Sequence, residues 1–128
     1  MPTILQTILL ISLGAVVGAN LRYFVAQYVL RLIPSTFPFG TLVINISASF
    51  VLGFFLIWTS ERVLADPRWR LLIAVGFCAT YSTYSSFAFE TFALVEKGQM
   101  PQALLNILVT NVVCFVAVML GAALARSL

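Results

Sequence analysis

The sequence contains no histidine and very few charged residues. Only 9% of its 128 residues are Asp, Glu, Lys or Arg, whereas an ordinary soluble domain carries about 25%. Because 62% of the residues are hydrophobic, so few charges cannot cover a water-facing surface. The lack of histidine excludes imidazole catalysis, histidine metal sites and histidine proton relays. We therefore expect an integral membrane protein rather than a soluble enzyme.

Positive charge is also scarce and forms no patch. Seven Lys and Arg and four Asp and Glu give a net charge of +3, and this sparse distribution predicts no nucleic-acid binding. The two cysteines, Cys78 and Cys114, lie in apolar stretches, so we expect buried free thiols rather than a disulfide or metal pair. The first ten residues show neither a basic region nor a cleavage site, which argues against a removable signal peptide.

Long hydrophobic runs take up most of the chain. A membrane-spanning helix needs about 20 apolar residues, and four such runs occur, at about residues 4–24, 39–60, 71–95 and 101–125. The prolines lie at or outside the ends of these runs, where a missing N–H costs least. The connections are short, so neighbouring helices should pack antiparallel. The sequence predicts a single all-α membrane domain over residues 1–128.

The positive charges barely orient this bundle in the membrane. With four spans, the N-terminus, the second connection and the C-terminus share one side, which carries four arginines. The other side carries two cationic residues, or three if Arg22 is included. Cytoplasmic loops normally hold a clear excess of Lys and Arg, so this weak bias permits insertion in both orientations; a weakly biased single orientation is the alternative. Gly14 and Gly18 form a GxxxG surface for close helix contact, within one subunit or between two.

Polar side chains inside the hydrophobic runs gather in four places. Such groups are costly in lipid and usually face a partner or a wet cavity. The second and fourth groups below have i, i+4, i+8 spacing, which puts their members on one helix face. Such a face could line a path for an ion, or it could only form hydrogen bonds between packed helices. The four groups are Asn20 and Arg22; Thr41, Asn45 and Ser49; Thr80, Tyr81, Ser82, Thr83, Tyr84, Ser85, Ser86 and Phe87; and Asn106, Thr110 and Cys114.

The hydroxyl-rich segment 76–87, GFCATYSTYSSF, predicts a third helix that is broken in the middle of the membrane. A broken helix leaves carbonyl and N–H groups unpaired, and something buried there must use them. Free carbonyls suit a small hard cation such as Na⁺, and free N–H groups suit an anion. The alternative is an unbroken helix whose hydroxyls bond to their own carbonyls.

Two charged side chains lie within or near the spans. Arg22 is a fixed positive charge, either an anchor at the membrane surface or an attraction for an anion. Glu90 is either a proton carrier or a structural partner for Arg22 or the backbone. The sequence offers no nucleophile–base pair, carboxylate pair or metal cluster, so we do not expect an enzyme. An amide, hydroxyls and aromatic ring edges instead suit a small hydrated anion.

Three segments resemble the CrcB/Fluc family of fluoride channels: GANLRY at 18–23, FPFGTLVINISASFVLGF at 37–54 and GFCATYSTYSSFAFE at 76–90. The resemblance covers essentially the whole chain. It implies four-helix subunits in the lipid bilayer, paired as an antiparallel, dual-topology homodimer with two pores. It also implies a structural Na⁺ at the dimer centre, and passive export of fluoride across the bacterial inner membrane that reduces fluoride toxicity.

The resemblance further implies pore roles for individual residues. Asn45 is similar to the family's pore asparagine, and Tyr84 and Phe87 are similar to its two pore aromatics. Ser85 and Ser86 match hydroxyls that help to receive the ion. The remaining track positions are Thr41, Asn106, Thr110 and Cys114.

Outside the pore, the resemblance implies a metal site and a vestibule. Ala79 and Ser82 fall where backbone carbonyls bind the Na⁺. Arg22 matches a vestibule arginine, and Glu90 matches the glutamate that follows the aromatic residues.

Two positions depart from the family pattern and keep other interpretations open. Ala79 stands where glycine is usual, which matters if the Na⁺ turn needs a positive φ, and Tyr84 stands where phenylalanine is usual. These departures leave room for a heterodimer or a non-conducting partner subunit. A small dual-topology drug or cation exporter is another alternative, although it needs a carboxylate in the first span, where this chain has Arg22. A fluoride/proton antiporter would depend on Glu90.

Overall fold

The computed structural model describes residues 1–62 and 66–128, and every regular element in these residues is helical. The helices are α1 (Ile4–Leu32), α2 (Phe39–Ser60), α3 (Pro67–Trp69), η1 (Arg70–Cys78), α4 (Ala79–Tyr81), α5 (Tyr84–Glu96) and α6 (Met100–Ser127). In sequence order they make four segments that are long and apolar enough to cross a membrane, because α3 to α5 follow one another as a single span from Pro67 to Glu96. The predicted all-α fold with four spans is confirmed.

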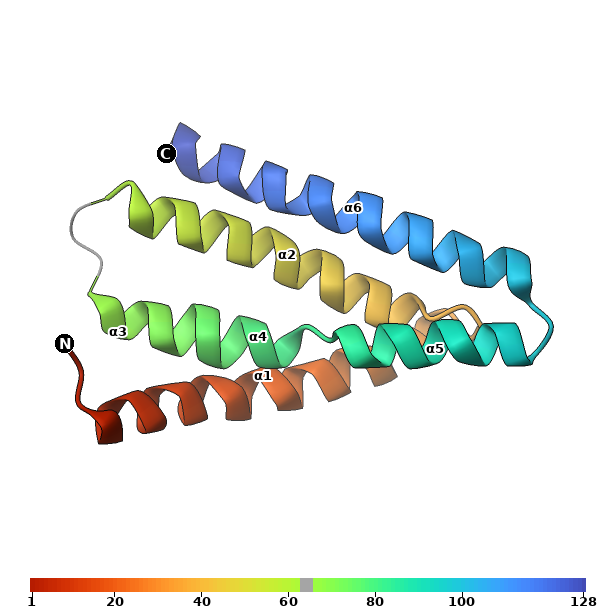
Figure 1. Cartoon of the computed structure of the whole chain (residues 1–128), viewed down its shortest axis with the longest axis horizontal. Helices are drawn as coiled ribbons and strands as arrows, with labels where there is room; N and C mark the ends of the chain where they lie inside the picture. The colour runs from red at the N-terminus through yellow and green to blue at the C-terminus, as the bar shows by residue number, and fades with distance from the viewer. Residues whose placement is uncertain (63–65) are drawn as a thin grey trace.

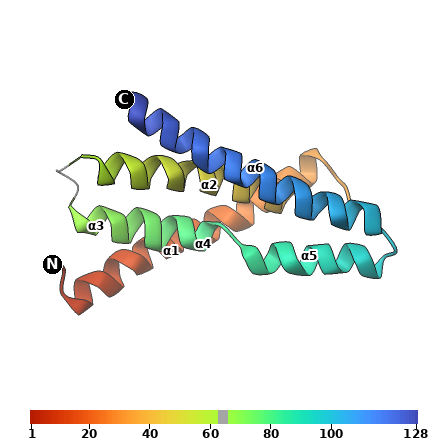
Figure 2. The ribbon, with the colours of Figure 1, turned by 45° about the horizontal axis from the view of Figure 1, so that its top comes forward.

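The spans lie side by side as an elongated bundle. Figures 1 and 2 show α1 beside the first half of the third span, and α2 beside α6. The N-terminus, the C-terminus, the end of α2 and the start of α3 all lie at one end of the bundle (Figure 1). This arrangement follows from an even number of antiparallel spans.

Helix α1 is longer than the sequence predicted. The first hydrophobic run was expected to end at about residue 24, but the helix continues to Leu32. Nothing before Pro34 breaks it, and the residue directly before a proline, here Ile33, is disfavoured in helix. At the other end, Thr3 forms a capping box with Gln6: its hydroxyl accepts the Gln6 N–H, and the Gln6 side chain accepts the Thr3 N–H.

Glycines bring the helices of each pair into backbone contact. A Cβ on Gly18 would lie 2.5 Å from the Phe77 carbonyl oxygen, and one on Gly14 would collide with the Leu72 carbonyl. Between α2 and α6, a Cβ on Gly53 would lie 2.5 Å from the Val118 carbonyl oxygen. The GxxxG surface of α1 therefore packs within the subunit, against η1, which decides between the two roles that the sequence left open.

The third span is broken, as predicted, at Ser82 and Thr83. Both residues are extended, with ψ 158° at Ser82 and φ −152° at Thr83, and α5 starts immediately after them (Figure 1). The half before the break holds a feature that the sequence did not predict: η1 is a nine-residue π-helix. π-helical turns are rare and are frequent at functional sites.

Replacing Gly14 with alanine should loosen the contact between α1 and η1. The added methyl group meets backbone atoms, the Phe77 nitrogen at 2.7 Å among them, and backbone cannot move aside as a flexible side chain can. Overpacking of this kind costs about 1–3 kcal/mol. We expect a lower thermal unfolding midpoint in detergent for Gly14→Ala, with exposed Ser12→Ala on the same helix as the control; equal midpoints would contradict the packing described.

Candidate functional site

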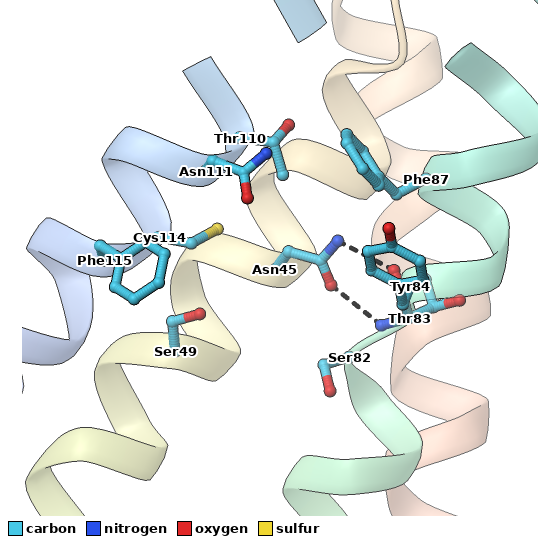
Figure 3. A pocket seen from close by; sticks show the side chains of 10 residues that line it. All are labelled: Asn45, Ser49, Ser82, Thr83, Tyr84, Phe87, Thr110, Asn111, Cys114 and Phe115. Carbon is cyan, nitrogen blue, oxygen red and sulfur yellow. Dashed lines mark hydrogen bonds between the residues drawn. The ribbon is translucent and has the colours of Figure 1, made fainter. Parts of the chain in front are cut away.

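The break in the third span is held by one side chain from α2. The Thr83 N–H donates to Oδ1 of Asn45 at 2.9 Å, and Nδ2 of Asn45 donates to the Thr83 carbonyl at 3.0 Å (Figure 3). An extended residue in a membrane helix loses its helical hydrogen bonds, and unpaired backbone groups are costly in lipid. The Asn45 amide replaces both of these bonds, so the backbone N–H and carbonyl of Thr83 are both satisfied at the break.

The residues around Thr83 complete the ends of the two half-helices. The N–H and the hydroxyl of Ser82 both donate to the Cys78 carbonyl, at 3.0 and 2.9 Å. The Thr83 hydroxyl accepts the Ser86 N–H at 3.2 Å and so caps α5. Helix α5 therefore begins inside the span, with the positive end of its dipole at the break.

A hollow of about 250 Å³ lies beside the break, between α2, α6 and the start of α5. It has room for a small ion with several waters, since each water takes about 30 Å³. No charged side chain is among its lining residues in the described part of the chain. The lining residues, all drawn in Figure 3, are Asn45 and Ser49 from α2; Ser82, Thr83, Tyr84 and Phe87 around the break; and Thr110, Asn111, Cys114 and Phe115 from α6.

Several residues that the sequence analysis assigned to a pore meet in this hollow. Asn45, Thr110 and Cys114 bring the α2 and α6 stripes together, although they lie far apart in the sequence. The rings of Tyr84 and Phe87 are adjacent, with centroids 5.6 Å apart and planes at 53°. Phe87 is buried whereas Tyr84 is 79% exposed, so one ring belongs to the core and the other projects from the subunit.

Thr41 and Glu90 do not line this hollow. They lie in a second one, of about 250 Å³, next to the end of α1 and the connection that follows it. The Thr41 hydroxyl donates to Oε1 of Glu90 at 2.8 Å, and within the described residues Oε2 of Glu90 is buried without a partner. The expectation that Glu90 pairs with Arg22 or the backbone is thus corrected: its partner is the Thr41 side chain. The ion pairs of the described residues do not include Arg22.

Asn106 supports the hollow from behind rather than lining it. It is only 1% exposed, donates to the Thr91 hydroxyl oxygen at 2.9 Å and accepts from the Thr110 hydroxyl at 3.2 Å. Thr91 in turn donates to the Phe87 carbonyl at 2.7 Å. This chain of bonds ties α6 to α5 close to the aromatic pair.

The remaining predicted residues lie near the break without facing the hollow. Ser85 is exposed, and the Ser86 N–H belongs to the α5 cap. Ala79 has φ −68°, and within the described residues only a glycine, Gly98, has a positive φ. Alanine in place of glycine at position 79 is therefore unstrained. Both cysteines are free, but only Cys78 is fully buried, since Cys114 is partly exposed to the hollow.

The sequence did not predict a pore role for four of the lining residues: Ser49, Thr83, Asn111 and Phe115. Ser49 and Thr83 were visible as polar residues in the spans, but nothing showed that the Thr83 backbone is the partner of Asn45. Asn111 and Phe115 follow Thr110 and Cys114 by one residue. They fall outside the i, i+4, i+8 stripe, and only the width of the hollow includes them.

The fold and this site define a four-span membrane protein with a broken third helix and an uncharged, donor-bearing hollow at the break. Residues 9–122 match the family described as CrcB-like protein, Camphor Resistance (CrcB). The chain belongs to this family and is a multi-pass membrane protein.

Curated relatives resemble the chain over nearly its whole length. A Fluoride-specific ion channel FluC from Koribacter versatilis is 48% identical over 118 residues, which cover 92% of this chain and 94% of the relative. One from Sulfurihydrogenibium sp. is 40% identical over 124 residues, 97% of this chain and 100% of the relative. One from Coxiella burnetii is 38% identical over 124 residues, with 96% and 100% coverage.

Replacing Asn45 with alanine should destabilise the break. Both backbone groups of Thr83 lose their partner, and each unsatisfied buried group costs about 1–3 kcal/mol. We expect a lower thermal unfolding midpoint and faster amide hydrogen exchange at residues 82–84. The matched control is Asn20→Ala, since among the described residues the Asn20 amide bonds only within its own helix, to the Val16 carbonyl at 2.6 Å. Exchange at the break as slow as in the unmodified protein would contradict the role of Asn45.

Proposed function

We propose that the chain forms a channel that conducts fluoride passively across the membrane. The observation that carries this proposal is the hollow at the helix break, which offers hydrogen-bond donors and ring edges but no charged group among its described lining residues. The relatives that bear the name Fluoride-specific ion channel FluC support it at up to 48% identity. In a bacterium, such a channel would lie in the inner membrane and release fluoride from the cytoplasm.

The chemistry of the hollow suits a small anion. Fluoride gives up strong hydrogen bonds to water only if donors replace them, and bonds to a charged acceptor are about twice as strong as neutral ones. Asn45 has a second N–H that Thr83 does not use. The N-terminal end of α5 adds a positive potential at Thr83 and Tyr84, and the edge of the Phe87 ring carries partial positive charge.

A second copy of the chain is proposed to complete the pore. The hollow opens towards side chains that project from the subunit: Tyr84 is 79% exposed and Phe115 is 70% exposed. An antiparallel homodimer fits the weak charge bias, because the end with both termini carries Arg62, Arg68, Arg70 and Arg126 and the other carries Arg31 and Lys97.

We further propose that the carbonyls of Ala79 and Ser82 hold a structural Na⁺ at the dimer centre. Helix α4 ends at Tyr81, so the carbonyls of its last turn have no partner in the helix. Carbonyl oxygens are suitable ligands for a hard cation, and Ala79 adopts an unstrained backbone conformation. A bound Na⁺ would supply a fixed positive charge next to the break.

The test is fluoride efflux from liposomes that hold only the purified chain, with valinomycin to carry potassium and chloride as the control ion. Fast fluoride release with little chloride leak is the expected result. A folded protein that releases no fluoride would contradict a self-sufficient channel. That outcome would favour the alternative in which the chain is a partner subunit and a second homologue completes the pore.

Exchanging Tyr84 for phenylalanine should leave fluoride conduction intact. The substitution removes a hydroxyl but keeps the ring edge beside Phe87, and the edge is what attracts an anion. We expect the efflux rate to change by less than about threefold, because removing one exposed hydroxyl is a small perturbation. Abolished efflux from a folded Tyr84→Phe protein would show instead that the hydroxyl is required.

The Glu90→Gln variant should also conduct. Its amide oxygen can still accept from Thr41, which donates to Oε1 of Glu90 at 2.8 Å, so the second hollow keeps its shape. A passive channel needs no proton carrier, whereas a fluoride/proton antiporter does. Efflux at the unmodified rate, without a pH gradient, is the expected result, and loss of efflux only in this variant would point to proton coupling.

A further inference from the structure

The hydroxyl groups near the hollow differ in whether their protons are free. The Thr110 hydroxyl donates to Oδ1 of Asn106 at 3.2 Å, so its proton points away from the hollow. The Ser82 hydroxyl donates to the Cys78 carbonyl at 2.9 Å. The Asn111 amide donates one N–H to the Ile107 carbonyl at 2.7 Å and, like Asn45, keeps a second N–H. An anion needs donors, so a polar residue whose proton is already used contributes little to binding it.

Ser49 differs from most hydroxyl residues of α2; Thr41, the other one that differs, donates to Glu90. Serine and threonine in helices commonly donate to the carbonyl one turn earlier, and three others on this helix do so. Ser47 donates to Val43, Thr59 to Phe55 and Ser60 to Ile57. Within the described residues, Ser49 makes no such bond to an oxygen.

The neighbours of Ser49 also favour a hydroxyl that can donate to an ion in the hollow. Ser49 lies next to Cys114 of α6 (Figure 3) and is a hydrogen-bond partner of that thiol, but a thiol sulfur is only a weak acceptor. Ser49 lies four residues after Asn45, on the same face of α2. The Ser49 hydroxyl and the second N–H of Asn45 therefore both border the hollow from one helix.

We infer that the Ser49 hydroxyl, together with the second N–H of Asn45, donates hydrogen bonds to the permeating anion, and that Ser49 is therefore a determinant of fluoride conduction. This inference rests on the proposed function and names residues within it. Thr110 and Asn106 then act as supports that fix α6 against α5, and the Cys114 sulfur, a weak acceptor, competes only weakly with an anion for the Ser49 proton.

The test is the unitary fluoride current of single channels in planar bilayers. The Ser49→Ala variant should pass about tenfold less current, because a hydrogen bond to a charged group is lost. A variant that merely folds poorly would give fewer channels with unchanged unitary current. The control is Ser60→Ala, which removes a hydroxyl from the same helix away from the hollow and should leave the current unchanged.

Restoring the hydroxyl provides a second measurement. Ser49→Thr should recover most of the current that Ser49→Ala loses. A Ser49→Ala current within about threefold of the unmodified one would overturn the inference, since the lost bond predicts a larger effect; so would a threonine variant no better than alanine. If the unmodified chain passes no fluoride current at all, the proposed function fails first, and the two failures are thus distinguishable.

Discussion

The structure depends on the requirement that every backbone polar group in the membrane interior finds a partner. The third span meets this requirement with a side chain from another helix, because its own hydrogen bonds stop at Ser82 and Thr83. Asn45 supplies one acceptor and one donor to the Thr83 backbone. An amide is the side chain that can do both without a charge. Once the break is held in this way, the N-terminal end of α5 and the hollow beside it can persist within lipid.

The close packing of the helices places Asn45 where the break needs it. Glycine contacts bring α1 against η1 and α2 against α6, so the backbone, rather than flexible side chains, sets the distances between spans. The bonds from Asn106 to Thr91 and from Thr110 to Asn106 then fix α6 relative to α5. As a result, the walls of the hollow are helices held at fixed distances. Most of their polar groups hydrogen-bond to one another, and few donors remain for an ion.

The sequence predicted the four spans, the break within residues 76–87 and much of the polar lining, because hydrophobic runs and dense hydroxyls are local signals. It did not predict the partner of Thr83 or the π-helix, since both depend on how the spans pack. Thr41 appeared to share a stripe with Asn45, but the extension of α1 to Leu32 and the following connection place it in a separate hollow with Glu90. Periodicity identifies a helix face, whereas only tertiary structure shows which cavity that face borders.

The central claim is that a fluoride ion meets the free N–H of Asn45 beside the broken helix. Solid-state NMR of the reconstituted chain, with ¹⁵N in its asparagine side chains and fluoride present, tests this contact through the dipolar coupling between ¹⁹F and ¹⁵N. The account predicts a coupling that corresponds to hydrogen-bond distance, assigned to Asn45 by its loss in the Asn45→Ala protein and its persistence in Asn20→Ala. Fluoride conduction with no such coupling would place the ion elsewhere and contradict the account.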